Sequence, residues 1–333
     1  MSFMDIRFLF TRDKMIKRLQ NAKPIPTVVM DAVFSDRPQL ASATVPVEDV
    51  SMVVRSMPVI QRGGASIAMA TPGLSISGYE PLPISLNIPV SAADINTLRQ
   101  YDAQGLEAWA ASKTETLRRT VRNTTEGIAA QALNGKVEWP IQLAGGGYDL
   151  YTVDWGRPIQ VTAPKRFDDA GAEIADAIEL LTLMRESMQR KGFGGGAVKV
   201  WAGKAAFFAL MRLVQSYEGD VIKAEIKESA IAIAGTEIVL RGEMYPLPGK
   251  KDTSREDAWA PVQNAKTLRM IDAAGGHQMP YCALDDLDAK LAPLPLFIKP
   301  IKQDDPSGYK LVAQSKPFPV PNMAAVAEST VTA

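Results

Sequence analysis

The 333-residue sequence contains one cysteine, Cys282, and one histidine, His277. A single cysteine cannot form an internal disulfide, and a single histidine cannot build a multi-histidine metal site. These absences exclude a disulfide-stapled secreted framework and a zinc centre. We therefore expect a reducing compartment and no cofactor.

Long hydrophobic runs are also absent. The longest apolar stretch, residues 205–214, is interrupted by Arg212 and is shorter than the ~18–20 apolar residues that a membrane-spanning helix needs. The first 23 residues carry six basic and two acidic side chains, but the apolar region of a signal peptide does not follow them. The sequence predicts a soluble protein without a membrane partner.

Charge is balanced overall and unbalanced locally. The chain has 37 basic and 37 acidic residues, yet residues 1–23 carry a net charge of +4 and residues 24–112 a net charge of −4. The second region contains no lysine. Residues 4–19 place apolar side chains near one face between basic ones, which predicts a short amphipathic helix or arm.

The middle of the chain changes its hydrophobic period. Residues 51–60 and 65–71 are rich in Val, Ile and Met and flank a turn at 61–64, which predicts a long hairpin. Residues 104–134 repeat apolar side chains at three- and four-residue steps and end at Gly135, which predicts one helix about 47 Å long.

The second half alternates shorter elements, and the fold class is mixed α+β with hairpins outnumbering crossovers. Asp168 or Asp169 is expected to cap a helix that ends near Gly192. A hairpin is expected to turn on Gly235 and Thr236, with a polar loop at 245–257. The remaining expected elements are strands at 148–154, 158–163, 197–202, 267–271, 296–301 and 309–313, a helix at 203–216, and terminal segments at 318–320 and 324–331.

The motifs that could carry catalysis fail on their context. Gly192 to Ala197 fits the spacing G-x-G-x-x-A, but a helix precedes it and a strand follows, the reverse of a dinucleotide site. Gly203 and Lys204 lack the upstream glycine and the following Ser or Thr of a phosphate loop. Asp285, Asp286 and Asp288 do not have the spacing of a calcium loop and are expected to cap a helix. With His277 and Cys282 expected to be structural, no catalytic, cofactor-binding or metal-binding residue is predicted, and an enzyme is not expected.

Several short motifs together resemble the major capsid protein family of lambda-like tailed phages, the phage capsid protein E family. The C-terminal stretch is the clearest, with residues 297–300, the turn at 304–306 and residues 311–321 matching the family's ending in order. Residues 153–156 resemble the family's Val-Asp-x-Gly. Arg62, Gly63 and Gly64, followed by Thr71, Pro72 and Gly73, resemble its hairpin region.

The resemblance implies the Hong Kong 97-type capsid fold. It assigns residues 1–40 to an N-terminal arm, 41–90 to the E-loop region, 91–195 to a P domain with spine helix 104–134, 196–292 to an A domain, and 293–333 to strands that return to the P-domain sheet and end in the A domain. Residues 246–257 would form a loop at the capsomer axis or surface.

The resemblance also implies a function: a head protein of a tailed phage or prophage that assembles in the host cytoplasm into hexamers and pentamers of an icosahedral procapsid, which expands and encloses double-stranded DNA in the virion. The expected partners are further copies of the chain, a decoration protein at threefold positions, a scaffolding protein and a portal, with DNA as non-specific content. Because residues 24–112 lack lysine, the isopeptide cross-link that some relatives form from an E-loop lysine is not expected.

The expected assembly residues lie in the arm, the hairpin and the motif after the long helix. The arm's Lys14, Lys17 and Arg18 would meet the acidic region 24–112 of a neighbouring subunit. The other candidates are Arg55, Arg62, Gly63, Gly64, Thr71, Pro72, Gly73, Asp154, Trp155 and Arg157.

Two other classes remain open from the residues alone. One is an α+β enzyme of unknown chemistry. The other is a protein that binds nucleic acid or a membrane surface through its basic arm.

Overall fold

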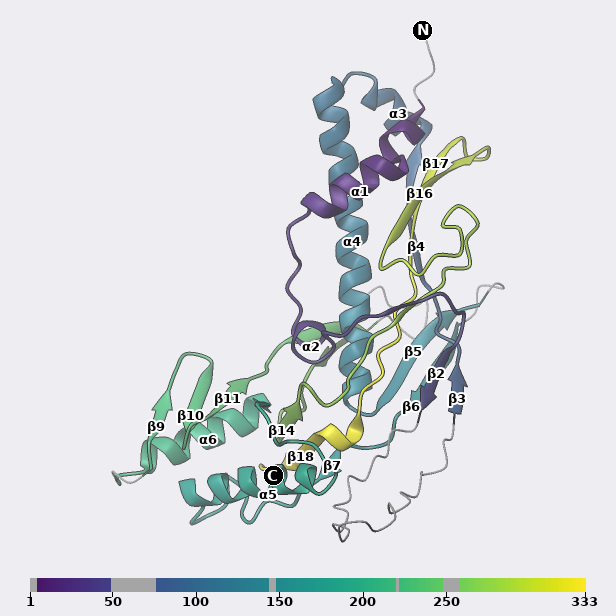
Figure 1. The fold of residues 1–333 in the computed structure, drawn as a ribbon. Helices are drawn as coiled ribbons and strands as arrows, with labels where there is room; N and C mark the ends of the chain where they lie inside the picture. The colour runs from purple at the N-terminus through teal and green to yellow at the C-terminus, as the bar shows by residue number, and fades with distance from the viewer. Residues whose placement is uncertain (1–4, 49–75, 144–147, 220–221, 248–257) are drawn as a thin grey trace, which may run out of the picture.

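Two hydrophobic bodies are joined by one long helix, α4 (Ala103–Leu133). The computed structural model describes residues 5–48, 76–143, 148–219, 222–247 and 258–333. In Figure 1, α4 runs from a small sheet near the N-terminal helices down to a large sheet that contains the C-terminal strand.

The helix α4 begins and ends at residues suited to those positions. The Asp102 side chain accepts the N–H of Gly105 at 2.7 Å, satisfying a free donor of the first turn. After the last residue, Gly135 has φ +97°, a conformation that other residues rarely adopt and that ends the helix. The helix predicted at 104–134 is confirmed.

The first body lies against the N-terminal half of α4. Its sheet has the order β16-β17-β4 and is antiparallel throughout. Two N-terminal helices and α3 pack around it, and Leu106, Leu117 and Tyr309 are among the buried residues of this core. The element bounds are η1 (Ile6–Phe10), α1 (Arg12–Asn21), α3 (Ala92–Leu98), β4 (Ile84–Ser91), β16 (Phe297–Gln303) and β17 (Gly308–Ser315).

The second body is built on a seven-stranded mixed sheet. The C-terminal strand of the chain lies inside this sheet, with a parallel neighbour on one side and an antiparallel neighbour on the other. The order is β7 (Ile159–Gln160), β18 (Val326–Thr330), β14 (Thr267–Asp272), β8 (Val198–Ala202), β11 (Thr236–Leu240), β10 (Ala230–Ile233) and β9 (Ala224–Ile226).

Both faces of the central strands are covered, so successive side chains enter different cores. Val200 of β8 packs with α5 (Ile174–Gln189) and α6 (Lys204–Ser216). Its neighbour Trp201 points to the other face, where α2 (Val29–Ala32) supplies Met30 and the end of α4 supplies Leu133. This double burial explains why β14 is buried at every position.

The described residues also form four separate two-stranded pairs. The pair β2–β3 is antiparallel and brackets residues 49–75. The short 3-10 helix η2 (Met323–Ala325) leads into β18. The pairs are β1 (Gln39–Leu40) with β15 (Tyr281–Cys282), β2 (Val45–Glu48) with β3 (Ile76–Tyr79), β5 (Lys136–Gln142) with β6 (Tyr148–Asp154), and β12 (Met244–Leu247) with β13 (Ala258–Pro261).

Two helix expectations need correction. The N-terminal helix expected at 4–19 is divided at Thr11, whose extended backbone (φ −64°, ψ 154°) separates η1 from α1. The helix expected to start at Asp168 or Asp169 begins at Ile174, because Gly171 (φ +76°) turns the chain first and Asp176 accepts the N–H of Glu173.

Three strand expectations also change. The turn between β10 and β11 is formed by Ala234 and Gly235, both with positive φ, one residue earlier than expected. The loop expected at 245–257 begins as β12, which pairs with β13. The sequence predicted no strand at Lys136–Gln142, where β5 pairs with β6 along its whole length.

The packing of α5 differs from the expected domain division. A boundary at residue 195 groups this helix with the spine helix. In the structure its buried residues Leu180 and Met184 pack with Val200 and Met270 of the seven-stranded sheet. The helix therefore belongs with the body that contains β8.

Candidate functional site

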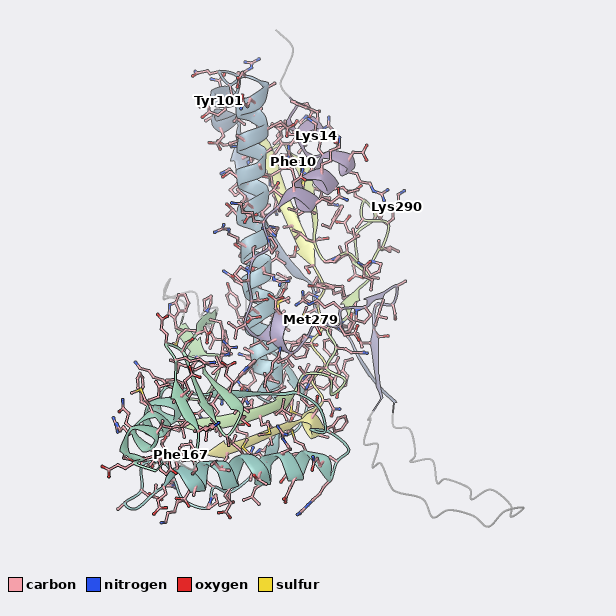
Figure 2. All side chains as sticks on the ribbon, turned by 60° about the vertical axis from the view of Figure 1, so that its left-hand side comes forward. Phe10, Lys14, Tyr101, Phe167, Met279 and Lys290 are labelled. Carbon is pink, nitrogen blue, oxygen red and sulfur yellow. The ribbon has the colours of Figure 1, made fainter. Side chains whose placement is uncertain are left out.

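The N-terminal segment η1–α1 is seated on the N-terminal half of α4 (Figure 1). Ile6, Leu9 and Phe10 are buried there. The Phe10 ring meets Trp109 of α4 edge-on, with centroids 6.1 Å apart. Figure 2 shows Phe10 and Lys14 beside this helix. Apolar contacts from the first turns hold the segment against its own subunit.

The charges of α1 also find a partner within the chain. Lys14 Nζ lies 2.7 Å from Glu107 Oε1, and Arg18 Nη2 contacts Glu107 Oε2. These hydrogen bonds, the one from Lys14 first, lower the pKa of the Glu107 carboxyl. Lys17 is exposed and has no ion pair within the described residues. Two of the three cations expected to meet a neighbour's acidic region thus meet an acidic residue of the same region in their own chain.

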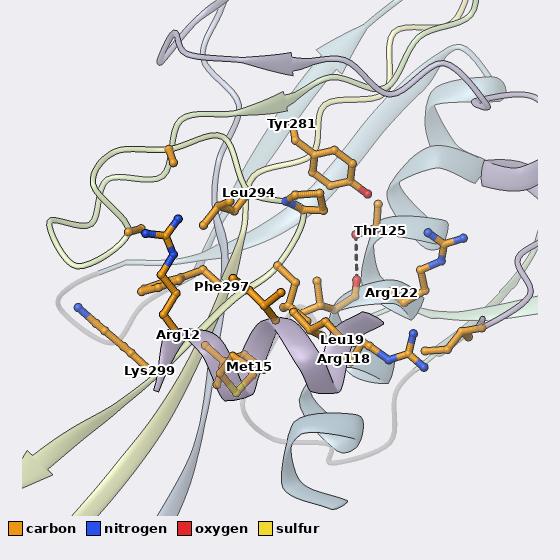
Figure 3. A pocket seen from close by; sticks show the side chains of 18 of the residues that line it. Arg12, Met15, Leu19, Arg118, Arg122, Thr125, Tyr281, Leu294, Phe297 and Lys299 are labelled. Atoms are coloured by element: carbon orange, nitrogen blue, oxygen red, sulfur yellow. Dashed lines mark hydrogen bonds between the residues drawn. The ribbon is translucent and has the colours of Figure 1, made fainter. Parts of the chain in front are cut away.

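An apolar cavity of about 1250 Å³ lies between α1, α4 and the chain before β16. We call it the α1 cavity. Its walls include Met15 and Leu19 of α1, Val121 of α4, and Leu294 and Phe297. Figure 3 shows Arg12 and Lys299 on one side of this cavity and Arg118 and Arg122 on the other. The cavity is apolar inside with cations at its edge.

The sequence motif around Trp155 forms a corner where three segments meet. The backbone N–H of Trp155 donates to Gly135 O at 2.7 Å, and Asp154 Oδ1 accepts the backbone N–H of Gly156 at 2.8 Å. The Trp155 ring lies 5.3 Å from Tyr79 and 5.4 Å from Phe318, centroid to centroid. This motif therefore joins the base of the β2–β3 hairpin to the end of α4 and to the C-terminal chain.

The other residues of that motif have different surroundings. Arg157 is exposed. Tyr151 of β6 donates its hydroxyl to Glu80 O at 3.1 Å, next to β3. The structure therefore brings Asp154 and Trp155 to the hairpin base and leaves Arg157 exposed at the surface.

Helix α2 is tied to α4 by carboxylates. Glu126 of α4 accepts backbone N–H groups of Val28, Val29 and Met30 at 2.6–3.0 Å, satisfying donors at the start of α2. Asp31 pairs with Arg37 and Arg122. Burial by itself would raise the pKa of Asp31, but hydrogen bonds from Arg37 and Thr27 outweigh it and lower the pKa to about 2.

The acidic residues near 285 bind lysines rather than cap a helix, so that expectation is wrong. Lys299 Nζ lies 2.7 Å from both Asp286 and Asp288. Lys316, which is buried, pairs with Asp285 at 3.1 Å.

Within the described residues, no group of three or more His, Cys, Asp or Glu side chains could hold a metal ion.

The one histidine and the one cysteine of the sequence, His277 and Cys282, are both buried. His277 Nδ1 accepts the N–H of Asn322 at 3.0 Å, and its ring meets Phe34 edge-on. Burial lowers the pKa of His277 to about 4 and raises the pKa of the Cys282 thiol. A neutral, packed histidine and a protonated thiol have structural roles here.

Seven predicted assembly residues fall in segment 49–75, outside the described residues: Arg55, Arg62, Gly63, Gly64, Thr71, Pro72 and Gly73.

Sequence reasoning missed Glu107, Glu126 and Tyr79, which position the arm, α2 and the hairpin base. No pattern marks these three, because each partner lies more than 70 residues away in the chain.

A family model described as phage major capsid protein E matches residues 11–331 of the chain. The chain belongs to this family. No curated protein matches it in sequence.

Solved structures show the same fold at low sequence identity. A protein described as the capsid protein of a prophage (E. coli CFT073) aligns with a TM-score of 0.63 and 14% identity, covering 96% of this chain and 98% of that one. The capsid of an empty GTA particle aligns with a TM-score of 0.50 and 11% identity, covering 94% of each chain.

The chain is thus a capsid protein of a tailed phage or prophage with the Hong Kong 97-type fold. Helix α4 is the long spine helix of this fold. Among the described residues, no helix is long and apolar enough to cross a membrane.

Proposed function

We propose that this capsid protein is the self-assembling shell subunit of an icosahedral procapsid, built from hexamers and pentamers, which expands and encloses double-stranded DNA. The match of the capsid family over residues 11–331 carries the proposal. The subunit acts through its surfaces and has no enzymatic role. Assembly takes place in the bacterial cytoplasm, and the mature location is the virion.

The shape of the subunit supports this function. The hairpin β2–β3 is attached to the body through its base, where Tyr79 packs on Trp155 and Phe318. The sequence predicts a long hairpin at 51–71, between these strands and outside the described residues. A projecting hairpin gains its stability when a neighbouring subunit supplies the contacting surface, and many weak contacts then act together.

The domain plan follows the family with one change. Residues 1–40 form the arm, 41–90 the E-loop region, and 91–195 the P domain, except that α5 is grouped with the A domain because it packs on the seven-stranded sheet. Residues 196–292 form most of the A domain. Residues 293–333 return through β16 and β17 and end as β18.

The proposed partners are other copies of the chain, a decoration protein at threefold positions, a scaffolding protein and a portal. DNA is held as non-specific content, which suits a chain with no net charge because each phosphate contact would add salt-dependent adhesion. Shells should be held together by noncovalent contacts. An SDS-resistant ladder of subunits from mature particles would contradict this last point.

Electron microscopy of the expressed chain, alone and with the scaffolding protein of the same phage, tests the function. Capsomers, tubes or shells are expected. A chain that stays a small oligomer under both conditions, while retaining its native circular dichroism spectrum, would rule out the shell function and favour a binding protein.

Lys17 offers a test of the arm. Since Lys14 and Arg18 already pair with Glu107, Lys17 remains for a contact between subunits. We expect Lys17→Glu to reduce particle yield, whereas Lys191→Glu, at an exposed position outside the arm, should not. Equal yields from the two variants would discard the arm contact.

A further inference from the structure

A surface loop presents an unusually exposed leucine. Residues 284–292 connect β15 to the chain before β16, and we call them the Leu287 loop. The side chain of Leu287 is 86% exposed, the highest value among the exposed large hydrophobic residues of the described chain. Asp285 and Asp288 lie on either side of it and are also largely exposed, at 67% and 71%. The loop is an apolar tip with acidic flanks.

This loop is held in one conformation from several directions. Lys299 of β16 binds Asp286 and Asp288, and Lys316 binds Asp285. Asp286 Oδ1 also accepts the N–H of Asp288 at 2.9 Å, and the Leu291 N–H donates to Asp286 O at 3.2 Å. A leucine tip fixed by these contacts is presented to solvent without the entropy cost of ordering a free loop.

The backbone of the loop is strained. Lys290 and Leu291 have φ +56° and +53°, a region that residues other than glycine rarely occupy. Such conformations persist where the surroundings impose them, and they cluster at active sites, ligand clamps and switch regions. Leu291 is a second exposed apolar residue of the same loop.

The α1 cavity has the opposite character. Its interior is apolar, and its lining contains six basic side chains, Arg12 and Lys290 among them, against two acidic ones, Asp31 and Asp288. Arg12 and Lys290 have no ion pair within the described residues, so positive charge remains there for a ligand. At about 1250 Å³ the cavity can hold the tip of a loop rather than one side chain.

A copy cannot fill its own cavity with its own tip. Asp288, Ala289, Lys290 and Ala292 of the Leu287 loop already form part of the cavity wall. Leu287 does not line the cavity and faces solvent. An apolar tip with acidic flanks and an apolar hollow with a basic edge therefore lie side by side on one surface, as in a contact between copies of one chain.

We propose that the Leu287 loop of one subunit inserts into the α1 cavity of a second copy. Leu287 fills the apolar interior. Asp285 and Asp288 already bind Lys316 and Lys299 of their own chain through one carboxylate oxygen each, and they meet Arg12 and Lys290 of the second copy with the other. This contact deepens the proposed function, on which it rests, by naming two surfaces that meet during assembly.

Cross-linking between two variants tests the contact directly. Ile16 lines the cavity on α1 and is partly exposed, so Ile16→Cys and Leu287→Cys both change surface positions. Mixed and mildly oxidised at assembly concentration, the two variants should give a disulfide-linked dimer. Each variant alone, and the wild type with its buried Cys282, should give none. The matched control uses Phe208→Cys, at an exposed position of α6, in place of Leu287→Cys. Mixed with Ile16→Cys, this variant should form no disulfide-linked dimer.

A second measurement avoids new cysteines. Leu287→Ser should raise the lowest protein concentration that forms particles by about tenfold or more, because apolar contact area is lost. Leu150→Ser, at a partly exposed leucine of β6, should change it by less than about twofold.

The outcomes separate the contact from the shell function. Particles that form with no link between positions 16 and 287, and with Leu287→Ser assembling like the wild type, overturn the contact and leave the shell function standing. A link from Ile16→Cys to Ile60→Cys instead assigns the cavity to segment 49–75 of a neighbour and also overturns the contact. A wild type that forms no particles while the mixed variants still link overturns the shell function and supports the contact.

Discussion

Arg269 of β14 and Glu328 of β18 form an ion pair inside the protein. Arg269 Nη2 lies 3.2 Å from Glu328 Oε1, with 2% and 13% of the two side chains exposed. The same Arg269 nitrogen donates to Asn134 Oδ1 at 2.7 Å, at the end of the spine helix. Burial lowers the pKa of Arg269, while Glu328 opposes this effect. One guanidinium thus links α4 to the C-terminal strand of the seven-stranded sheet.

Removal of this carboxylate should be costly. Glu328→Gln leaves Arg269 buried without a counter-charge, and we expect a loss of about 3–5 kcal/mol in the free energy of unfolding. Urea unfolding of the subunit measures this. Glu237→Gln, which breaks the exposed pair with Lys227, should cost less than about 1 kcal/mol. Similar losses in both variants would contradict the structural importance of the buried pair.

The end of the spine helix requires glycine at position 135. Gly135 has φ +97°, and a Cβ there would lie 2.0 Å from Gly156 O. We expect Gly135→Ala to destabilise the subunit by about 3 kcal/mol or more. Gly156→Ala is the matched control, because Gly156 has φ +80° but open space around it, and should cost about 1 kcal/mol. Thermal unfolding compares the two variants, and an equal shift in Tm would refute the steric argument.

Stability should fall in mild acid because of His277. Its pKa is about 4 when folded and 6.5 as the ordinary value, so the unfolded chain binds a proton that the folded chain does not. The contribution of His277 to the free energy of unfolding is fully present above pH 6.5. It decreases as the pH falls, and about 3 kcal/mol is lost at pH 4.

Urea unfolding between pH 7 and pH 4.5 measures this slope. His277→Asn can keep an acceptor for the Asn322 N–H and removes the titration, so its stability should change little over the same range. The low pKa of Asp31 acts in a separate window, where stability is lost as the pH falls from 3.8 towards 2. A wild type and a His277→Asn variant with the same slope would exclude His277 as the cause.

The stability with which α1 is held against α4 should depend on Glu107. Glu107→Gln weakens the pairs with Lys14 and Arg18, and we expect faster amide hydrogen exchange in residues 12–21. Global stability should change by no more than about 1 kcal/mol, because Glu107 is partly exposed. Glu115→Gln, which affects pairs within α4 only, is the control and should leave exchange in α1 unchanged.

Local pattern predicted the elements whose boundaries are encoded by nearby residues. The apolar period and Gly135 predicted α4, and the motif order around residues 297–321 indicated the family. The predicted cap of α5 was wrong because Gly171, with its positive φ, turns the chain before the helix begins. Strand β5 was missed because its stability comes from pairing with β6 rather than from its own alternation.

The candidate site was less accessible to sequence reasoning. Lys14, Arg18, Asp154 and Trp155 were named, but Lys14 and Arg18 were expected to meet a neighbour and instead meet Glu107, 93 and 89 residues further along the chain. Long-range pairs of this kind have no local signature.

The sequence by itself determined the long helix and the absence of a multi-histidine or disulfide framework, because these depend on composition and on periodicities within one segment. The class of protein was indicated by the resemblance of its short motifs to a known family. Only the tertiary structure decided that the basic arm lies on its own spine helix, that α5 belongs with the seven-stranded sheet, and that an acidic leucine tip lies beside a basic-edged cavity. Each of these depends on which distant surfaces are brought together, and folding settles this through burial and charge pairing across the whole chain.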